Sequence, residues 1–76
     1  MSFKASIHDR VVLVVDVPCD FSDGMIPKGT QGTVVERYES PKEEYAVDLE
    51  VADDSQIGGF RYENVVLLPE QFGIVR

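Results

Sequence analysis

Few side chains in this chain of 76 residues could carry out chemistry, because it contains one histidine, His8, and one cysteine, Cys19. Paired with His8, Cys19 or Ser22 could act as a nucleophile only if the N-terminal arm folded back across the first strand. We expect instead an exposed or hydrogen-bonded His8 and a small, semi-buried Cys19 at a strand end. The sequence therefore predicts no catalytic residue and a protein that is not an enzyme.

Two acidic pairs, Asp53-Asp54 and Glu43-Glu44, are the candidates for binding a divalent cation. Residues 53–58 lack the alternating acids and terminal glutamate of a calcium loop, so a solvated turn is the expected structure. One cysteine and one histidine can build neither a zinc site nor a disulfide framework. We expect neither a metal nor a cofactor.

The charge balance favours protein partners over nucleic acid. Fourteen acidic residues against seven basic ones give a formal net charge of -7, which opposes binding to a phosphate backbone and favours basic or amphipathic partners. The longest purely apolar stretch, residues 11–15, is far shorter than the roughly 20 residues that span a membrane. We expect no membrane contact and a cytoplasmic location.

These side chains must be positioned by short strands in one small domain, with an N-terminal arm over residues 1–9 and a C-terminal tail over 69–76. Valine-rich and alternating segments predict strands at 10–17, 30–38, 44–51, 57–62 and 65–68, with a long first loop and a tight turn at Glu63-Asn64. The predicted fold is all-β, a small, highly bent, five-stranded antiparallel barrel. The period of two predicts an inward-facing set: Val11, Leu13, Val15, Val34, Tyr45, Val47, Leu49, Val51, Val65 and Leu67.

Four segments resemble the Src-homology-3-like barrels: residues 9–13, 27–36, 45–49 and 64–67. More narrowly they resemble a family of short, uncharacterised bacterial single-domain proteins, and this likeness implies a fold and no activity. The Lys-Gly-x-x-Gly-Thr-Val-Val block at 28–35 is also similar to the Gly-x-x-Gly-x-Val core of the KOW motif of ribosomal proteins and transcription elongation factors. An RNA-binding or ribosome-associated protein is therefore an alternative function, although turn geometry also explains Gly29 and Gly32.

A partner-binding groove is expected between the long first loop and the turn after the second strand. Apolar anchors with an acidic rim suit a basic or Pro-rich peptide, although the chain lacks the tryptophan that lines the groove of peptide-binding Src-homology-3 domains. The hypothesis is a protein-interaction or accessory domain; an acidic inhibitor or immunity-type protein is a further alternative. Phe21 and Ile26 could instead simply close the barrel end. The predicted groove residues are Phe21, Met25, Tyr38, Glu36 and Glu39.

Apolar residues on both faces of the first and last strands predict self-association, most simply a two-fold homodimer. Val12 and Val14 lie opposite the inward residues of the first strand, and the tail adds further apolar side chains beyond Pro69. The alternative is that the tail folds back over Val12 and Val14 within one chain. The predicted self-association residues are Val12, Val14, Val66, Leu68, Phe72 and Ile74.

Overall fold

The computed structural model describes residues 3–19 and 24–76, and the all-β prediction is confirmed. The elements in chain order are β1 (Arg10–Leu13), β2 (Val17–Pro18), β3 (Met25–Ile26), β4 (Gln31–Tyr38), β5 (Glu44–Ala52), β6 (Phe60–Leu67), the 3₁₀ turn η1 (Pro69–Gln71) and β7 (Phe72–Ile74). None of the helical structure in these two ranges has the length and apolar character needed to cross a membrane.

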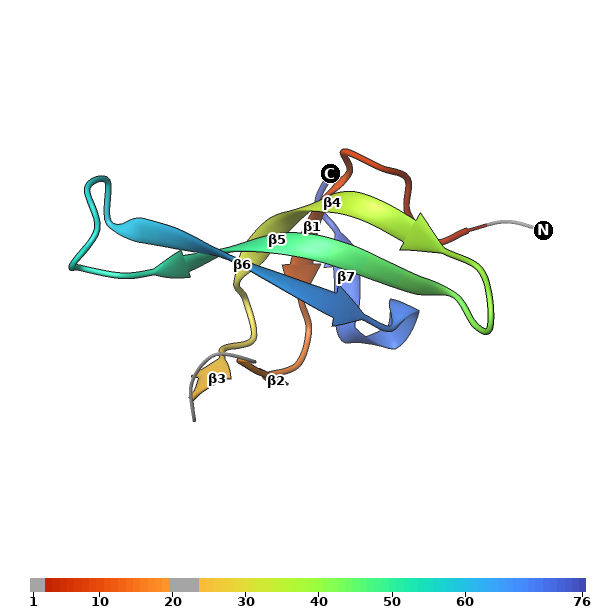
Figure 1. Cartoon of the computed structure of the whole chain (residues 1–76), viewed down its shortest axis with the longest axis horizontal. Helices are drawn as coiled ribbons and strands as arrows, with labels where there is room; N and C mark the ends of the chain where they lie inside the picture. The colour runs from red at the N-terminus through yellow and green to blue at the C-terminus, as the bar shows by residue number, and fades with distance from the viewer. Residues whose placement is uncertain (1–2, 20–23) are drawn as a thin grey trace.

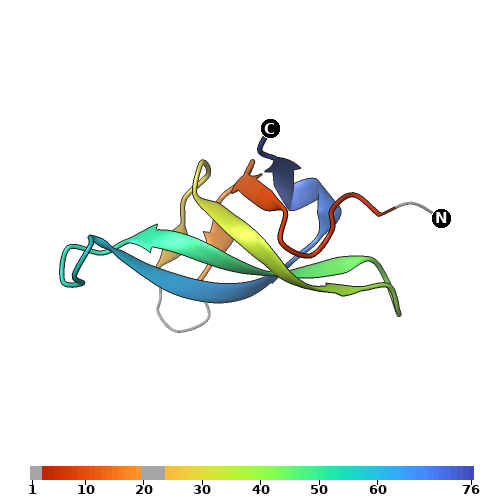
Figure 2. The same cartoon turned by 90° about the horizontal axis from the view of Figure 1, so that it is seen from above.

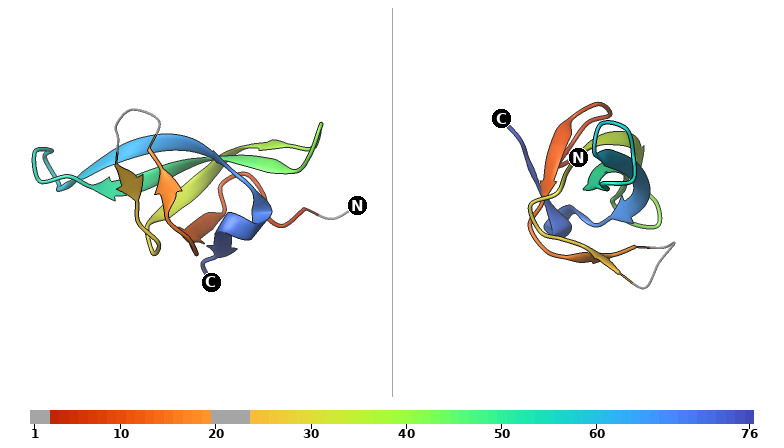
Figure 3. Two further views of the ribbon diagram at one scale, coloured as in Figure 1. Left: turned by 90° about the horizontal axis from the view of Figure 1, so that it is seen from below. Right: turned by 90° about the vertical axis from the view of Figure 1, so that its left-hand side faces the viewer.

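The strands form one large and one small antiparallel sheet. The five-stranded sheet has the order β6-β5-β4-β1-β7, so β6 and β7 are its edges, and β2 pairs with β3 in a separate two-stranded sheet (Figure 1). The small sheet lies as a second layer against one side of the large one (Figures 2 and 3). Within the described ranges, backbone pairing does not close the two sheets into a barrel.

The core follows from the alternation of apolar residues along the strands. On β5, Tyr45, Val47 and Leu49 are completely buried, as the period of two requires for a strand with one covered face. Val51, nearer the hairpin end, is only partly buried. The other predicted inward residues are also buried except Val15, which is 42% exposed.

The exposure of Val15 corrects the prediction of a first strand over residues 10–17. β1 ends at Leu13, where the backbone N–H donates to Thr30 O and the carbonyl accepts from Gly29 N, both at 2.9 Å. The chain then bends before β2, so the alternation of faces does not continue through Val15. A run of valines indicates a strand but does not tell where its hydrogen-bonding partner ends.

The predicted turn at Glu63-Asn64 is wrong, because β6 runs without interruption through these residues. Glu63 pairs with Leu49 and Asn64 with Asp48, and the Asn64 Nδ2 donates to Asp48 Oδ1 at 2.8 Å. Pairing with β5 thus provides hydrogen-bonding partners for two polar residues whose types, taken alone, favour a turn. The predicted strands at 57–62 and 65–68 are therefore one strand that begins at Phe60.

The fifth strand of the large sheet is β7, which lies in the predicted tail. Phe72 pairs with Leu13, and Ile74 with Val11, so the tail covers β1 of its own chain. Phe72 is 1% exposed and packs edge-on against Tyr45, with ring centroids 5.2 Å apart. Phe72 therefore belongs to the main core.

The N-terminal arm fastens this C-terminal segment to the sheet. The Lys4 ammonium donates to the carbonyls of Pro69, at 2.6 Å, and Phe72, and it lies 4.9 Å from the centre of the Phe72 ring. Ala5 is buried, and its N–H donates to the Tyr45 hydroxyl at 3.2 Å. The two ends of the chain are thus held together around one aromatic pair.

The two glycines of the KOW-like block, Gly29 and Gly32, are needed for different structural reasons. Gly29 has a φ of +95°, a conformation that costs little only for glycine. Gly32 lies inside β4, where a Cβ atom would come within 2.5 Å of the Asp48 carbonyl oxygen on β5. Gly32 therefore permits close approach of two strands, and turn geometry explains Gly29 alone.

Candidate functional site

The predicted groove residues do not lie together. Met25 is on β3 and 57% exposed, whereas Tyr38 ends β4, is 43% exposed and pairs with Glu44. β3 and the end of β4 point to opposite ends of the molecule (Figure 1), and the exposed Glu36 and Glu39 accompany Tyr38. Phe21 lies outside the described residues. The length of β4, eight residues, carries Tyr38 away from the first loop.

Met25 instead borders an open groove of about 690 Å³ between the β3–β4 connection and the hairpin end of β5 and β6. Its apolar lining includes Met25, Pro27, Val51 and Phe60. Lys28 and Glu50 are the charged residues that line it. Lys28, Val51 and Phe60 were not singled out from the sequence as groove residues, because the fold brings them next to Met25 from distant positions.

One wall of the groove is a closely bonded turn at residues 27–30. The Thr30 N–H and hydroxyl both donate to the Pro27 carbonyl, at 3.2 and 2.8 Å. The Lys28 N–H donates to Asp16 Oδ1 at 2.7 Å, which ties the turn to the chain after β1. The Lys28 ammonium takes part in no hydrogen bond or ion pair with any described residue, so a ligand could accept from it.

The opposite wall carries Glu50, which Arg10 holds by two hydrogen bonds. Arg10 Nη1 donates to Glu50 Oε2 at 2.7 Å and Nη2 donates to Oε1 at 3.2 Å. Arg10 also donates to Thr33 Oγ1 and Gln31 Oε1, at 3.1 and 3.2 Å. The hydrogen bond from Arg10 lowers the pKa of Glu50 below its ordinary value of 4.5. The carboxylate therefore stays ionised at neutral pH, and its negative charge is already paired with the positive charge of Arg10.

Comparison with known proteins found no matching family model, curated protein or solved structure. The groove combines apolar lining residues with two walls fixed by hydrogen bonds, an arrangement suited to binding a ligand.

The residues considered for catalysis occupy separate places. His8 is exposed in the turn before β1, has a φ of 80°, and donates its backbone N–H to Val34 O at 2.7 Å. Cys19 is buried and directly follows β2. Within 3–19 and 24–76, no three His, Cys, Asp or Glu side chains are grouped so that they could hold a metal ion.

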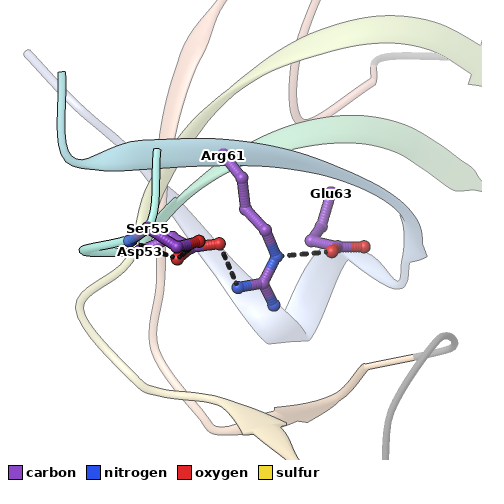
Figure 4. A network of polar contacts seen from close by, with 4 residues as sticks. All are labelled: Asp53, Ser55, Arg61 and Glu63. Atoms are coloured by element: carbon purple, nitrogen blue, oxygen red, sulfur yellow. Dashed lines mark hydrogen bonds and ion pairs between the residues drawn. The ribbon is translucent and has the colours of Figure 1, made fainter. Parts of the chain in front are cut away.

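One member of each acidic pair considered for cation binding, Asp53 and Glu43, is engaged by other residues of the chain. Asp53 accepts from the Ser55 N–H and hydroxyl at 3.0 and 2.6 Å and forms an ion pair with Arg61 at 3.4 Å (Figure 4). Hydrogen bonds from Ser55 lower the pKa of Asp53. Glu43 accepts from the Tyr45 hydroxyl and from Lys4 N, and the first of these bonds lowers its pKa most.

The predicted self-association residues do not form one patch. Phe72 is buried, Ile74 packs on the core, and Val12 and Leu68 are half-buried. Val14 and Val66 are exposed, at 43% and 54%, but two strands, β4 and β5, separate β1 from β6 in the sheet. A different apolar group is exposed on β6 itself, where Phe60 and Tyr62 are 56% and 69% exposed.

Proposed function

We propose that this protein is a non-enzymatic protein-interaction domain that binds an extended segment of a partner protein in the groove beside Met25. The observation that carries the proposal is an exposed apolar lining held between two walls that hydrogen bonds already fix. A preformed apolar site loses little conformational entropy when a ligand binds.

The partner segment should contain an apolar side chain for the groove and basic residues beside it. Met25, Val51 and Phe60 offer apolar contact surface, and the net charge of -7 attracts basic segments during encounter. The Lys28 ammonium could donate to a backbone carbonyl of the bound segment. An acidic inhibitor that covers a basic site on another protein would use the same charge.

We also propose that the fold is of the Src-homology-3-like kind. Support comes from the order of the elements: a long first loop that carries the β2–β3 hairpin, a β4 strand with an irregularity between Val34 and Glu36, and a single 3₁₀ turn before the last strand. That last strand returns to pair with β1. The resemblance of residues 28–35 to the KOW motif is part of this proposal about the fold.

The groove is tested by selecting peptides from a random 12-residue display library and titrating them into isotope-labelled protein. Shifts of backbone amide signals should centre on Met25, Val51 and Phe60, and Met25→Ser should weaken binding about tenfold, since burying a large apolar side chain contributes roughly 1.5–3 kcal/mol. Ile57→Ser is the matched control, because Ile57 is fully exposed and lies outside the groove lining. Shifts confined to other surfaces, or equal loss in both variants, would count against the groove.

A further inference from the structure

The outer side of β6 is an eight-residue edge that pairs with no strand in the described part of the chain. β6 is the terminal strand of the large sheet and pairs with β5 in an unbroken register from Ala52–Phe60 to Tyr45–Leu67. Natural proteins commonly protect such edges with short strands, lysine, proline, a bulge or inward-pointing charges. β6 is long and has no lysine, proline or bulge, but it carries inward-pointing charges, whereas the opposite edge strand, β7, has only three residues.

The pairing with β5 determines which groups of β6 are free. The N–H of Asp53 donates to Gly59 O at 2.8 Å, and hydrogen-bonded pairs alternate along an antiparallel ladder. The odd-numbered residues of β6 therefore bond to β5. The backbone N–H and C=O groups of Phe60, Tyr62, Asn64 and Val66 point away from it, toward the edge. The side chains of these four residues also lie on the exposed face of the strand.

The inner face of β6 carries opposite charges at adjacent positions. Arg61 and Glu63 point to this face, and Arg61 Nε donates to Glu63 Oε1 at 2.8 Å (Figure 4). Their side chains are 36% and 12% exposed, so both lie partly sheltered beside the free edge. Inward charges discourage edge pairing, but an incoming strand that places an opposite charge directly across from each of them gains a favourable pair instead.

We infer that two copies of this chain pair through their β6 edges, antiparallel, about a two-fold axis at Tyr62. In this register Tyr62 faces the partner's Tyr62, and Arg61 faces the partner's Glu63 in the closely spaced, non-hydrogen-bonded position. The two-fold axis repeats that contact, so four charges alternate in sign across the interface. The five-stranded sheets would then join into one continuous sheet.

Charge favours this register over the two nearest alternative registers. Only the even-numbered residues of β6 turn their N–H and C=O groups toward the edge, so the partner strand can shift only in steps that keep even-numbered residues opposite each other. One such step places Glu63 opposite the partner's Glu63, and the other places Arg61 opposite the partner's Arg61. Like charges directly opposite each other destabilise a strand pair. The second copy is therefore a better occupant of this edge than an arbitrary extended peptide, which would need matching charges by chance.

This inference shares the interaction role proposed above and one residue, Phe60, with the groove, but the positions varied in its tests, 62 and 64, lie outside the groove lining, so the two fail separately. Multi-angle light scattering at about 100 μM, where a small interface should be populated, is expected to give twice the chain mass of 8.5 kDa. Asn64→Pro should give the single-chain mass, because it removes an N–H that points to the edge and is not used in the β5 ladder. Asn64→Thr keeps this N–H and should remain dimeric.

The register is tested by oxidation of Tyr62→Cys and Asn64→Cys, each in a Cys19→Ser background. Across the axis the two Cα atoms at position 62 would be about 5.5 Å apart, within the range of a disulfide, whereas those at position 64 would be about 13 Å apart. Tyr62→Cys should therefore cross-link at least tenfold faster.

A wild-type monomer, a dimeric Asn64→Pro variant or equal cross-linking at both positions would overturn the inference. If Asn64→Pro fails to fold, the cysteine pair still decides. An intact dimer that selects no peptide would overturn only the groove proposal, and Met25→Ser should leave the dimer mass unchanged.

Discussion

Gly32 shows how a single absent methyl group permits the sheet to form. Its position on β4 leaves no room for a Cβ atom beside the Asp48 carbonyl, while Gly73 on β7 has only ordinary contacts, the nearest at 3.7 Å from Val14. We expect Gly32→Ala to lower the free energy of unfolding by about 2–3 kcal/mol, because backbone cannot move aside as a side chain can. Urea unfolding measures this, with Gly73→Ala as the control expected to cost below about 1 kcal/mol. Equal losses in the two variants would contradict the role given to Gly32.

The Arg10–Glu50 pair links residue chemistry to stability against acid. Because its pKa is lowered in the fold, Glu50 binds a proton less readily when folded, and it contributes stability above its ordinary value of 4.5. This contribution to stability is lost as the pH falls through 4.5 toward the lower pKa that Glu50 has in the folded protein. The pair is partly exposed, at 39% and 32% of the two side chains, so we expect Glu50→Gln to cost about 0.5–1 kcal/mol at pH 7.

The measurement is thermal or urea unfolding of wild type and Glu50→Gln between pH 7 and 3. The stability difference between them should shrink as the pH drops below 4.5. Glu70→Gln is the comparison, since Glu70 is exposed and makes no ion pair within the described part of the chain. A Glu50→Gln difference that stays constant with pH would show that the charge of Glu50 is not what stabilises the wall.

At the scale of elements, β7 is the segment whose placement changes the expected behaviour of the protein. The side chain of Phe72 lies in the core against Tyr45, under the Lys4 ammonium. We expect Phe72→Ala to cost about 3–5 kcal/mol in unfolding free energy, the usual loss for a buried phenylalanine. That loss is a large part of the stability of a small domain.

Circular dichroism during urea unfolding measures this loss, with Val75→Ser as the control. Val75 is 37% exposed and follows β7, so its replacement should change stability by about 0.5 kcal/mol or less. If Phe72→Ala were as mild as Val75→Ser, the tail would not contribute to the core in solution.

For the whole molecule, the net charge of -7 separates the two main functional alternatives. Exposed Phe60 and Tyr62 could stack on bases, but Glu50 lies directly opposite Tyr62 on β5, and Asp48 lies opposite Asn64. We expect no binding of single- or double-stranded RNA in a low-salt fluorescence-polarisation titration, where phosphate contacts are strongest. Micromolar binding that weakens steeply with added salt would favour the RNA alternative over the protein-interaction proposal.

Local sequence determined those features that depend on a residue and its nearest neighbours along the chain. The alternation from Glu44 to Val51 predicts β5 and its buried face, because successive side chains of a strand point to opposite sides. The Pro27-Lys28-Gly29 turn likewise follows from the φ that Gly29 alone adopts easily. Strand type and most of the core were therefore predictable.

Only the tertiary structure decided which segments pair and where side chains from distant positions meet. Glu63 and Asn64 are residue types that favour a turn until β5 supplies them with partners. The apolar tail could cover either a second copy or its own first strand, and the structure pairs Phe72–Ile74 with β1 of the same chain. The candidate site has the same origin, since Met25 meets Phe60 instead of Tyr38. Pairing depends on contacts between residues far apart in the chain, and their free energy has no signature in the local pattern on which the sequence predictions rest.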